Sequence, residues 1–453
     1  MVEMNEKVAE KSIVEEEKTE EEKEKMRIEL NVNAKEKTLR FARAILRVLG
    51  EDRNKRDEFI EKFLGVKRDK CNILTADFKF YQRSQAIYAA NLFPTKSIDC
   101  KIIKVTNITD EGERAPTYER IQIKPDKKIS LLTIGEFLLE WKNEKIILEI
   151  YFCGYTRRIR LYSKNIELAS DFQDEFMRFM KTQNFLKGKR LIFLPRSEID
   201  FLEFPKLNWK DVILKQELTD SIMLNIVFPI TNEKKCTEIK IPWRRGLLMG
   251  SVAGTGKTQV CRILCNVLPD SITLIWATPK ALYESEKIQD LFEAARYFSP
   301  TLIIIEDIDF IGTSRDFVQN PILGELLTQL DGNDPNHGIF VIATTNRPEQ
   351  LDVALANRPS RFDVKLEFSL PEENERIELM KLFTKGMKFD QSIDYKKIAA
   401  ISNGLTGAHI KEIFVYAQLK ALKRGSKKIS FSDVEERVKQ YKADDGSRKA
   451  YTE

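Results

Sequence analysis

The sequence predicts an α/β core over residues 206–370, preceded by an α+β domain over residues 37–205. Three observations carry this prediction. The β-branched apolar runs Leu302–Ile305 and Ile339–Ala343 have the composition of fully buried parallel strands. A further apolar run ends at Gly250 and leads into a glycine-rich loop. Apolar residues at helical spacing follow that loop, so strand, loop and helix succeed one another as they do in a parallel α/β sheet.

Composition limits the class of protein. The chain has 453 residues, of which 42% are hydrophobic and 32% charged, and this excludes a collagen, a wholly disordered chain and a polytopic membrane protein. Its six cysteines form no Cys-x-x-Cys pair and it has two histidines, so we expect neither a disulfide framework nor a zinc site. The start lacks a signal-peptide pattern, and no apolar window reaches the roughly 18 residues of a spanning helix. We therefore expect a soluble, cytoplasmic protein with no membrane span.

Charge is unevenly distributed along the chain. The first 30 residues carry eleven acidic and six basic side chains, a net charge of −5. Because the whole chain carries +5, the remaining 423 residues carry +10, which permits a nucleic acid or an acidic partner without requiring one. Residues 1–36 have too few apolar side chains to offset the entropy cost of ordering, so we expect a charged, disordered tail.

The α+β domain mixes helical and strand patterns. Apolar residues at helical spacing predict a helix over 39–49. The β-rich runs Ile146–Cys153 and Thr156–Tyr162 are separated by a Gly-Tyr pair, which predicts a hairpin. A Ser170-x-x-Gln173 capping box predicts the start of a helix. The apolar face of that helix would comprise Phe172, Phe176, Phe179 and Met180.

One face of the second hairpin strand carries basic residues. Arg158, Arg160 and Tyr162 alternate with other residues, so they share one face of the strand. Such a face suits phosphate or an acidic protein. The interpretation that we favour is an ordinary solvated face.

A candidate phosphate-binding loop follows Gly250. The run Ser251-Val-Ala-Gly-Thr-Gly-Lys-Thr258 lies between a strand and a helix, which is the context that a P-loop requires. Its glycines let backbone N–H groups approach a phosphate, and the helix N-terminus adds its positive end. Lys257 would face the β- and γ-phosphates and Thr258 would bind Mg²⁺. The strict spacing has glycine in place of Ser251, so we expect backbone strain there.

Acidic and polar residues end the two buried strands. Glu306-Asp-Ile-Asp309 follows the first strand, and Asn346 follows the second. Acids at the carboxyl end of a buried strand beside a P-loop are placed to hold Mg²⁺ and an attacking water, which Asn346 would orient. Farther along, Arg358 and Arg361 suit a charge-neutralising finger that enters the site of a neighbouring subunit in a ring.

Five motifs in order resemble those of an AAA ATPase of the classical clade, over residues 207–440. Gly254–Thr258 resembles the Walker A core and Ile305–Asp309 resembles Walker B. The others are similar to the clade's Leu-Leu-Thr-Glu-Leu-Asp-Gly helix, its second region of homology and the Gly-Ala-Asp element of its lid. They are Leu326–Gly332, Ala343–Pro348 with the two arginines, and Thr406–Ile410.

This resemblance implies a fold and a role for each site residue. The fold is a P-loop core over 206–370 with a C-terminal helical lid and tail over 371–453. Asp307 would be the catalytic base, Glu306 with Thr258 would hold Mg²⁺, Asn346 would be sensor 1, and Arg358 and Arg361 would act in trans. The implied ATP-binding residues are Ser251, Val252, Ala253, Gly254, Thr255, Gly256, Lys257, Thr258, Gln259, Gly407 and Ala408, with Val212 and Ile213 as weaker candidates for the adenine pocket.

The chain departs from the family pattern in ways that bear on its chemistry. The order Glu306-Asp307 replaces Asp-Glu and resembles the Bcs1-type branch, but the sequence lacks that branch's membrane-spanning N-terminal segment, so we do not place the chain there. Asp307 is one methylene shorter than glutamate, so a water would sit about 1.5 Å closer or the backbone would shift. Tyr283 occupies the position of an unfoldase pore loop without the following glycine, so a grip on substrate and simple surface packing both stay open.

Three other features of the core have two interpretations each. Cys261 and Cys265 are expected to pack in a core rather than form a redox pair. His409 is expected to be structural or exposed rather than a nucleotide contact. Asp309 would either support the metal shell or cap the strand end.

From these residues we expect Mg²⁺-dependent ATP hydrolysis in a homo-oligomeric, hexameric ring. The energy would remodel or disassemble a protein partner chosen by residues 37–205. A nucleic-acid-handling ATPase stays open because of the +10 charge and the Arg158–Arg160 strand. A nucleotide-gated scaffold with little hydrolysis stays open because of Ser251 and Asp307.

Overall fold

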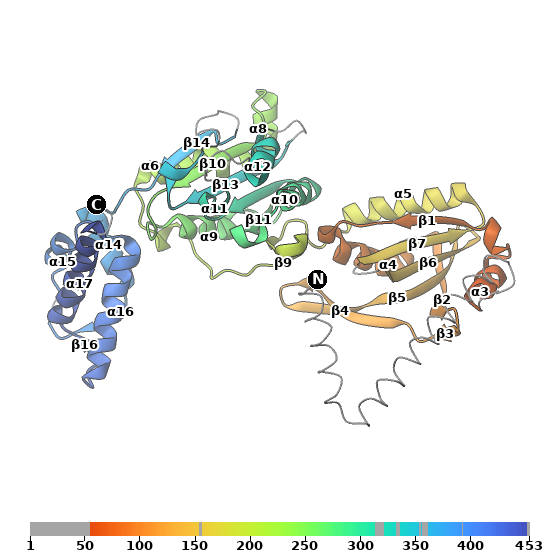
Figure 1. Cartoon of the computed structure of the whole chain (residues 1–453), viewed down its shortest axis with the longest axis horizontal. Coiled ribbons are helices and arrows are strands. Elements are labelled where there is room, and N and C mark those ends of the chain that lie inside the picture. The colour runs from red at the N-terminus through yellow and green to blue at the C-terminus, as the bar shows by residue number, and fades with distance from the viewer. Residues whose placement is uncertain are drawn as a thin grey trace, which may run out of the picture. The chain divides into compact units, whose positions relative to one another are not determined.

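The computed structural model describes residues 55–153, 156–312, 321–331, 336–352, 355, 361–391 and 393–450 (Figure 1). The chain divides into two compact units. The described residues of the first come from 55–76, 91–118 and 132–175, and those of the second from 77–90, 119–131 and 176–450. The predicted tail over 1–36 and helix over 39–49 lie outside the described residues.

An antiparallel sheet makes up most of the first unit, with β1, β7, β6, β5, β2 and β3 in that order across it. Strand β6 pairs with β7 from Ile146 opposite Ser163 to Cys153 opposite Thr156, so the predicted hairpin is confirmed. The strands are β1 (Asn72–Ala76), β2 (Cys100–Thr109), β3 (Gly112–Arg114), β4 (Thr117–Lys124), β5 (Lys127–Trp141), β6 (Glu144–Cys153) and β7 (Thr156–Ser163).

Helices cover both faces of this sheet. Helix α3 (Lys55–Leu64) packs two buried side chains against Leu138, Ile147 and Tyr162. On the other face, Phe172 of α5 (Ile166–Thr182) contacts Phe93 of α4 (Arg83–Lys96) and Trp141, with ring centroids 5.1 and 5.2 Å apart. Adjacent residues of a strand point to opposite faces, and helices cover both faces of this sheet. For this reason β5 is buried along almost its whole second half.

Helix α5 begins earlier than predicted, so the capping box at Ser170 is wrong. The helix starts at Ile166, and Asn165 Oδ1 accepts the backbone N–H groups of Glu167 at 2.9 Å and Leu168 at 3.4 Å. Asparagine is a strong N-cap residue, and the Ser-x-x-Gln pattern also occurs inside helices. The predicted apolar face is buried at Phe172, Phe176 and Met180, and Phe179 is half-buried.

The basic strand face is packed against acidic and aromatic side chains and only partly solvated, so the favoured interpretation of an ordinary solvated face does not describe it. Tyr162 is only 1% exposed, and its hydroxyl donates to Glu149 at 2.7 Å. Arg160 donates to the hydroxyls of Tyr162 at 3.0 Å and Tyr151 at 2.7 Å, and it pairs with Glu149 at 3.5 Å. The acidic partner is therefore on the neighbouring strand β6, a pairing that the pattern of one strand does not reveal.

A mostly parallel sheet forms the centre of the second unit. Its order is β14-β10-β13-β12-β11-β8-β9, and only the β8–β9 pair is antiparallel. The strands are β8 (Arg190–Phe193), β9 (Ile199–Phe201), β10 (Arg245–Gly250), β11 (Thr273–Ala277), β12 (Thr301–Ile305), β13 (Ile339–Thr345) and β14 (Val364–Glu367). Every residue of β11, β12 and β13 is buried, as predicted for central parallel strands.

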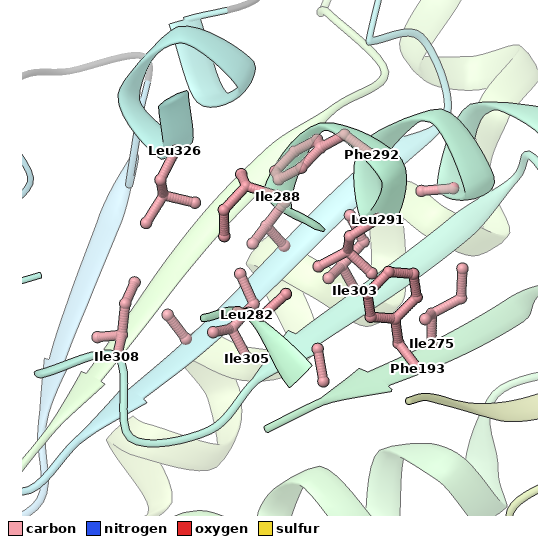
Figure 2. Packing of buried hydrophobic residues seen from close by; sticks show 14 of the residues in the cluster. Phe193, Ile275, Leu282, Ile288, Leu291, Phe292, Ile303, Ile305, Ile308 and Leu326 are labelled. Carbon is pink, nitrogen blue, oxygen red and sulfur yellow. The ribbon is translucent and has the colours of Figure 1, made fainter. Parts of the chain in front are cut away.

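Helices pack on both faces of this sheet. Ile303 and Ile305 of β12 pack in one cluster with α10 and α12 (Figure 2), and their neighbours Leu302 and Ile304 pack in a second cluster with α9. Cys261 and Cys265 are buried in the second cluster as free thiols, so the predicted core packing is confirmed. The helices are α6 (Gln216–Ile222), α7 (Phe228–Thr231), α8 (Glu233–Glu238), α9 (Lys257–Val267), α10 (Ser285–Tyr297), α11 (Asp309–Gly312) and α12 (Pro321–Asp331).

Strands β8 and β9 join this sheet although they precede residue 206. Leu191 of β8 pairs with Ile275 of β11. The sheet therefore begins earlier in the chain than the boundary proposed from the sequence. The limits 37–205, 206–370 and 371–453 otherwise stay predictions about domains.

Four helices form the C-terminal part of the second unit (Figure 1). They are α14 (Glu373–Phe383), α15 (Tyr395–Ile401), α16 (Gly407–Lys423) and α17 (Phe431–Ala450), accompanied by the short strands β15 (Lys388–Phe389) and β16 (Lys428–Ile429). They share a core that includes Ile398, Ile413, Phe414 and Val434. The predicted α/β core with a helical lid is confirmed. Among the helices that the structure describes, none combines the length and the apolar character needed to span a membrane.

Candidate nucleotide-binding site

The glycine-rich loop connects the end of β10 to the start of α9. Gly254 and Gly256 have φ values of +85° and +107°, a region that side chains other than glycine rarely adopt. A Cβ atom on Gly254 would lie 2.8 Å from both Ala408 Cβ and Thr406 Oγ1 of the lid. Glycine is therefore needed here both for the turn and for the close approach of the lid.

Ser251 shows no backbone strain, contrary to the sequence-based expectation. It is not among the described residues with positive φ, so the strict glycine is not required at this position. Its hydroxyl donates to the carbonyl of Phe368, and its backbone N–H donates to the carbonyl of Thr345 at 3.3 Å. Serine thus ties the loop to the ends of two neighbouring strands.

The Lys257 side chain lies inside the loop. Its Nζ donates to the backbone carbonyls of Ser251 at 2.8 Å and Val252 at 3.0 Å. Burial lowers the pKa of Lys257, and the charges of Asp307 and Asp309 act in the opposite direction. The loop therefore holds a buried amine close to the acids at the end of β12.

Thr258 and Glu306 lie together, as the sequence predicts for a Mg²⁺ site. The Thr258 hydroxyl donates to Glu306 Oε1 at 3.0 Å. Glu306 Oε2 accepts the indole N–H of Trp276 at 3.0 Å. No cluster of three or more His, Cys, Asp or Glu side chains with the geometry of a metal site occurs in the described part of the chain. One carboxylate and one hydroxyl fit Mg²⁺, which proteins bind through one or two carboxylates together with substrate phosphates.

Asp307 and Asn346 form a second polar pair beside the first. Asn346 Nδ2 donates to Asp307 Oδ1 at 2.7 Å. Asp307 has φ of +47°, and its N–H donates to Thr344 Oγ1 at 3.1 Å. Burial raises the pKa of Asp307, and the neighbouring acids Asp309 and Glu306 raise it further while Lys257 lowers it. An acid with raised proton affinity, held by an amide, is suited to accept a proton.

Asp309 positions Asn346 through the backbone. Asp309 Oδ1 accepts the Asn346 N–H at 3.2 Å, and only 7% of the Asp309 residue is exposed. Of its two predicted roles, this contact agrees with a structural one at the strand ends.

Several of these groups line one cavity of about 480 Å³. Its size lies within the usual range for small-molecule sites. Val212 and Ile213, the weaker candidates for an adenine pocket, are both on its wall. So are the loop residues from Ala253 to Gln259, Asp307 and Asn346. The lid contributes Leu379, Leu382, Phe383, Gly407, Ala408 and Lys411.

The lid contacts the loop through the start of α16. The Ala408 N–H donates to the carbonyl of Gly254 at 3.1 Å. Thr406 caps the helix by accepting the His409 N–H, and His409 Nδ1 accepts the Thr406 N–H at 3.3 Å. The predicted structural role of His409 therefore agrees with these contacts. Gly407 and Ala408 lie where a nucleotide between loop and lid would contact them.

Of the two predicted finger arginines, Arg361 is among the described residues. Arg361 is 6% exposed, and its Nε and Nη2 donate to the Asp331 carboxylate at 2.8 and 2.7 Å. Arg358 lies outside the described residues. Arg361 is thus held by its own chain.

Three further aromatic side chains lie outside the list of predicted ATP-site residues. Trp276, which binds Glu306, was missed by sequence reasoning, although a tryptophan in a buried strand must find an acceptor for its N–H. Phe310, directly after the acids, is 73% exposed. Tyr283 is 48% exposed just before α10, which is compatible with both of its predicted roles.

Comparison with known proteins agrees with this geometry. Residues 247–370 match the ATPase family associated with various cellular activities (AAA), and residues 392–436 match the AAA+ lid domain. The chain is 32% identical over 252 residues to the proteasome-activating nucleotidase of Aeropyrum pernix, which is 53% of this chain and 61% of that protein. It is 32% identical over 259 residues to 26S proteasome regulatory subunit 6A of Saccharomyces cerevisiae, 54% of this chain and 58% of that protein.

A third relative is a different kind of protein. The chain is 31% identical over 240 residues to the ATP-dependent zinc metalloprotease FtsH 2 of a Thermoanaerobacter species, 51% of this chain and 46% of that protein. The chain thus spans about half to three-fifths of the length of these relatives. The P-loop, the paired acids and the contacting lid lie in these matched regions, so residues 247–370 are similar to an AAA ATPase domain and residues 392–436 to an AAA+ lid.

Proposed function

We propose that this chain hydrolyses ATP with Mg²⁺ and that the hydrolysis drives remodelling of a protein partner. The observation that carries this proposal is that one cavity is lined by Lys257, by Thr258 and by the Asp307–Asn346 pair. Thr258 in turn donates to Glu306. Each pair supplies a different part of phosphoryl transfer, and the lid supplies the wall opposite the loop.

Nucleotide binding uses the loop and the lid together. Backbone N–H groups of the loop and the start of α9 bind the phosphates, and Lys257 exchanges its two carbonyl contacts for phosphate oxygens. Apolar side chains from both the core and the lid, including Val212, Ile213 and Leu379, would hold the adenine. Because the cavity is shared by core and lid, binding favours the arrangement in which Ala408 contacts Gly254.

The two acids have separate roles. Thr258 and Glu306 would hold Mg²⁺, whose charge offsets the negative charge of the β- and γ-phosphates. Asn346 fixes the rotation of the Asp307 carboxylate by binding Oδ1, so that its other oxygen accepts a proton from the attacking water. The raised pKa of Asp307 means that its carboxylate binds a proton more tightly. The left-handed backbone at this residue sets the direction of its short side chain.

The proposal of a homo-hexameric ring rests on the resemblance to AAA ATPases and not on a contact within this chain. We propose that Arg358 acts in trans on a neighbour's phosphate, whereas Arg361 anchors its segment through Asp331. The names of two relatives refer to the proteasome, which supports a protein partner. The Glu306-Asp307 order resembles that of the Bcs1-type branch. A cytoplasmic location remains a prediction from the sequence.

The alternatives have lost part of their support. Arg160 pairs with Glu149, so the strand that favoured a nucleic-acid-handling ATPase is occupied internally. Ser251 is unstrained, so one argument for a scaffold with little hydrolysis is removed. Turnover that a denatured polypeptide stimulates and a single-stranded nucleic acid does not would favour the protein-remodelling function over both.

The direct test is phosphate release by the full chain with ATP and Mg²⁺. Lys257→Ala should abolish nucleotide binding and hence turnover, because it removes the amine that faces the phosphates. Lys396→Ala, an exposed lysine on α15, should behave as the wild type. Normal hydrolysis by the Lys257→Ala variant would overturn the site assignment.

A further inference from the structure

Trp276 binds the oxygen of Glu306 that Thr258 does not. Indole Nε1–H donates to Glu306 Oε2 at 3.0 Å, and Thr258 Oγ1 donates to Oε1 at 3.0 Å. The Glu306 backbone N–H donates to the carbonyl of Ala277, the residue after Trp276, at 3.1 Å. Both oxygens and the backbone of Glu306 are therefore held, and two of these three contacts come from the end of β11.

Packing fixes the indole itself. Trp276 is 5% exposed and belongs to the cluster between the sheet and α9. The Phe204 ring packs against it at a centroid distance of 4.9 Å and an interplanar angle of 44°. Beside Phe204, the Pro205 carbonyl accepts Asn266 Nδ2 of α9 at 3.1 Å. The indole N–H consequently has a defined direction, and that direction is toward Glu306.

We propose that Trp276 is a positioning residue for the Mg²⁺-side carboxylate of the proposed ATPase site. By binding Oε2, it fixes the rotation of Glu306 so that Oε1 stays beside the Thr258 hydroxyl before the ion arrives. This inference rests on the proposed function, because it assigns Glu306 to the ion. Partners that orient a metal ligand typically account for 10- to 100-fold in metal affinity.

The chain offers a matched pair of tryptophans for the test. Trp276→Phe keeps an aromatic ring in the core and removes only the N–H donor. Trp243 lies in the same cluster, is 6% exposed, and donates its Nε1–H to the Pro229 carbonyl at 2.7 Å. Trp243→Phe therefore removes an equivalent hydrogen bond that does not reach Glu306.

The experiment measures binding of a fluorescent ATP analogue to the full-length protein, first in EDTA and then during a Mg²⁺ titration. Trp276→Phe should bind the analogue in EDTA as the wild type does. It should need about 10-fold more Mg²⁺ for the half-maximal response to the ion. Trp243→Phe should leave the Mg²⁺ midpoint unchanged. An unchanged midpoint in a folded Trp276→Phe protein overturns the proposal, as does an equal shift in both variants.

A second measurement covers the case in which Trp276→Phe does not fold. The wild-type protein is labelled with 5-fluorotryptophan, and its ¹⁹F spectrum is compared with that of Glu306→Gln, both without nucleotide. The signal that moves in this variant should be the one that moves when Mg²⁺ is added to the nucleotide-loaded wild type. Absence of a signal that responds to both changes overturns the proposal. If the wild type binds no nucleotide either in EDTA or with Mg²⁺, the proposed function fails instead.

Discussion

Two pairs of acidic residues in this chain have similar chemistry and opposite surroundings. Glu136 and Glu149 lie opposite each other on β5 and β6, and each is 3% exposed. Glu306 and Asp307 follow β12, and Asp307 lines the cavity. Burial raises the pKa of Glu136 to about 7, and burial also raises the pKa of Asp307. A shifted pKa by itself therefore does not distinguish a structural pair from a functional one.

The two pairs differ in the groups that bind or neighbour their carboxylates. Arg56 of α3 binds Glu149 and approaches Glu136 to 3.5 Å, and the Ile108 N–H donates to Glu136 at 2.9 Å. The partners of that pair are fixed parts of the first unit. Asp307 has a neighbouring cation, Lys257, that donates to two loop carbonyls and lies on the wall of a cavity. A cavity lined by a buried cation indicates a site more reliably than the pKa does.

The largest effect that we expect is at the site pair. Asp307→Asn should reduce kcat by roughly 10²- to 10⁴-fold while ATP binding is retained, because the amide cannot take a proton from water but can still accept from Asn346. Steady-state hydrolysis and nucleotide binding together measure this. The exposed Asp270 provides the control through Asp270→Asn. Wild-type turnover in Asp307→Asn would place the base elsewhere.

The corresponding change at the structural pair should affect stability instead. Arg56→Ala removes the cation that the two buried carboxylates share and leaves Glu149 with Arg160 alone, so it should cost about 3–5 kcal/mol in the free energy of unfolding of the first unit. Hydrogen exchange over β5 and β6 measures it. Arg114→Ala removes the exposed pair with Glu111, where both side chains are at least 60% exposed, and should cost about 1 kcal/mol or less. Equal effects of the two variants would contradict the comparison.

The pH dependence of the structural pair has a defined sign. An acid whose pKa is higher in the folded than in the unfolded state stabilises the fold when protonated. Glu136 should therefore stabilise the first unit below the model-peptide value of 4.5 and lose that contribution as pH rises toward 7. The loss is about 3 kcal/mol for Glu136 alone, from about 1.4 kcal/mol for each pKa unit. In Glu136→Gln, hydrogen exchange over β5 should lose this dependence, and an unchanged pH profile would assign it to another group.

The smallest effect concerns the wall of the cavity. Gly254→Ala should weaken nucleotide binding about tenfold, because the new Cβ would lie 2.8 Å from Ala408 Cβ and Thr406 Oγ1 of the lid. Gly386 has the same φ of +85°, and no atom lies within 4 Å of the position of its Cβ. Gly386→Ala should therefore carry the same backbone strain, but its nucleotide affinity should equal that of the wild type. Equal nucleotide affinities in the two variants would show that the close approach of the lid to Gly254 does not contribute to nucleotide binding.

Sequence reasoning succeeded where function depends on residues close together in the chain. The run Gly254–Thr258 specifies its own loop, and a buried strand places Glu306 and Asp307 at its end, because strand direction and glycine geometry are local properties. It failed at Ser170, where the true cap Asn165 lies five residues earlier. It also failed at Ser251, where contacts with Phe368 and Thr345 replaced the expected strain.

What the sequence by itself determined is the order of chemical groups along the chain: loop, acids, amide and lid. Only the tertiary structure decided which groups meet, since Trp276 of β11 reaches Glu306 at the end of the adjacent strand β12, and Arg160 of β7 pairs with Glu149 on the adjacent strand β6. Hydrogen bonds and ion pairs form only between groups about 3–4 Å apart. The separation of two residues along the sequence does not reveal whether they come that close, and only the packed chain does. Packing, and not pattern, therefore separates the acid pair that stabilises from the acid pair that we propose to react.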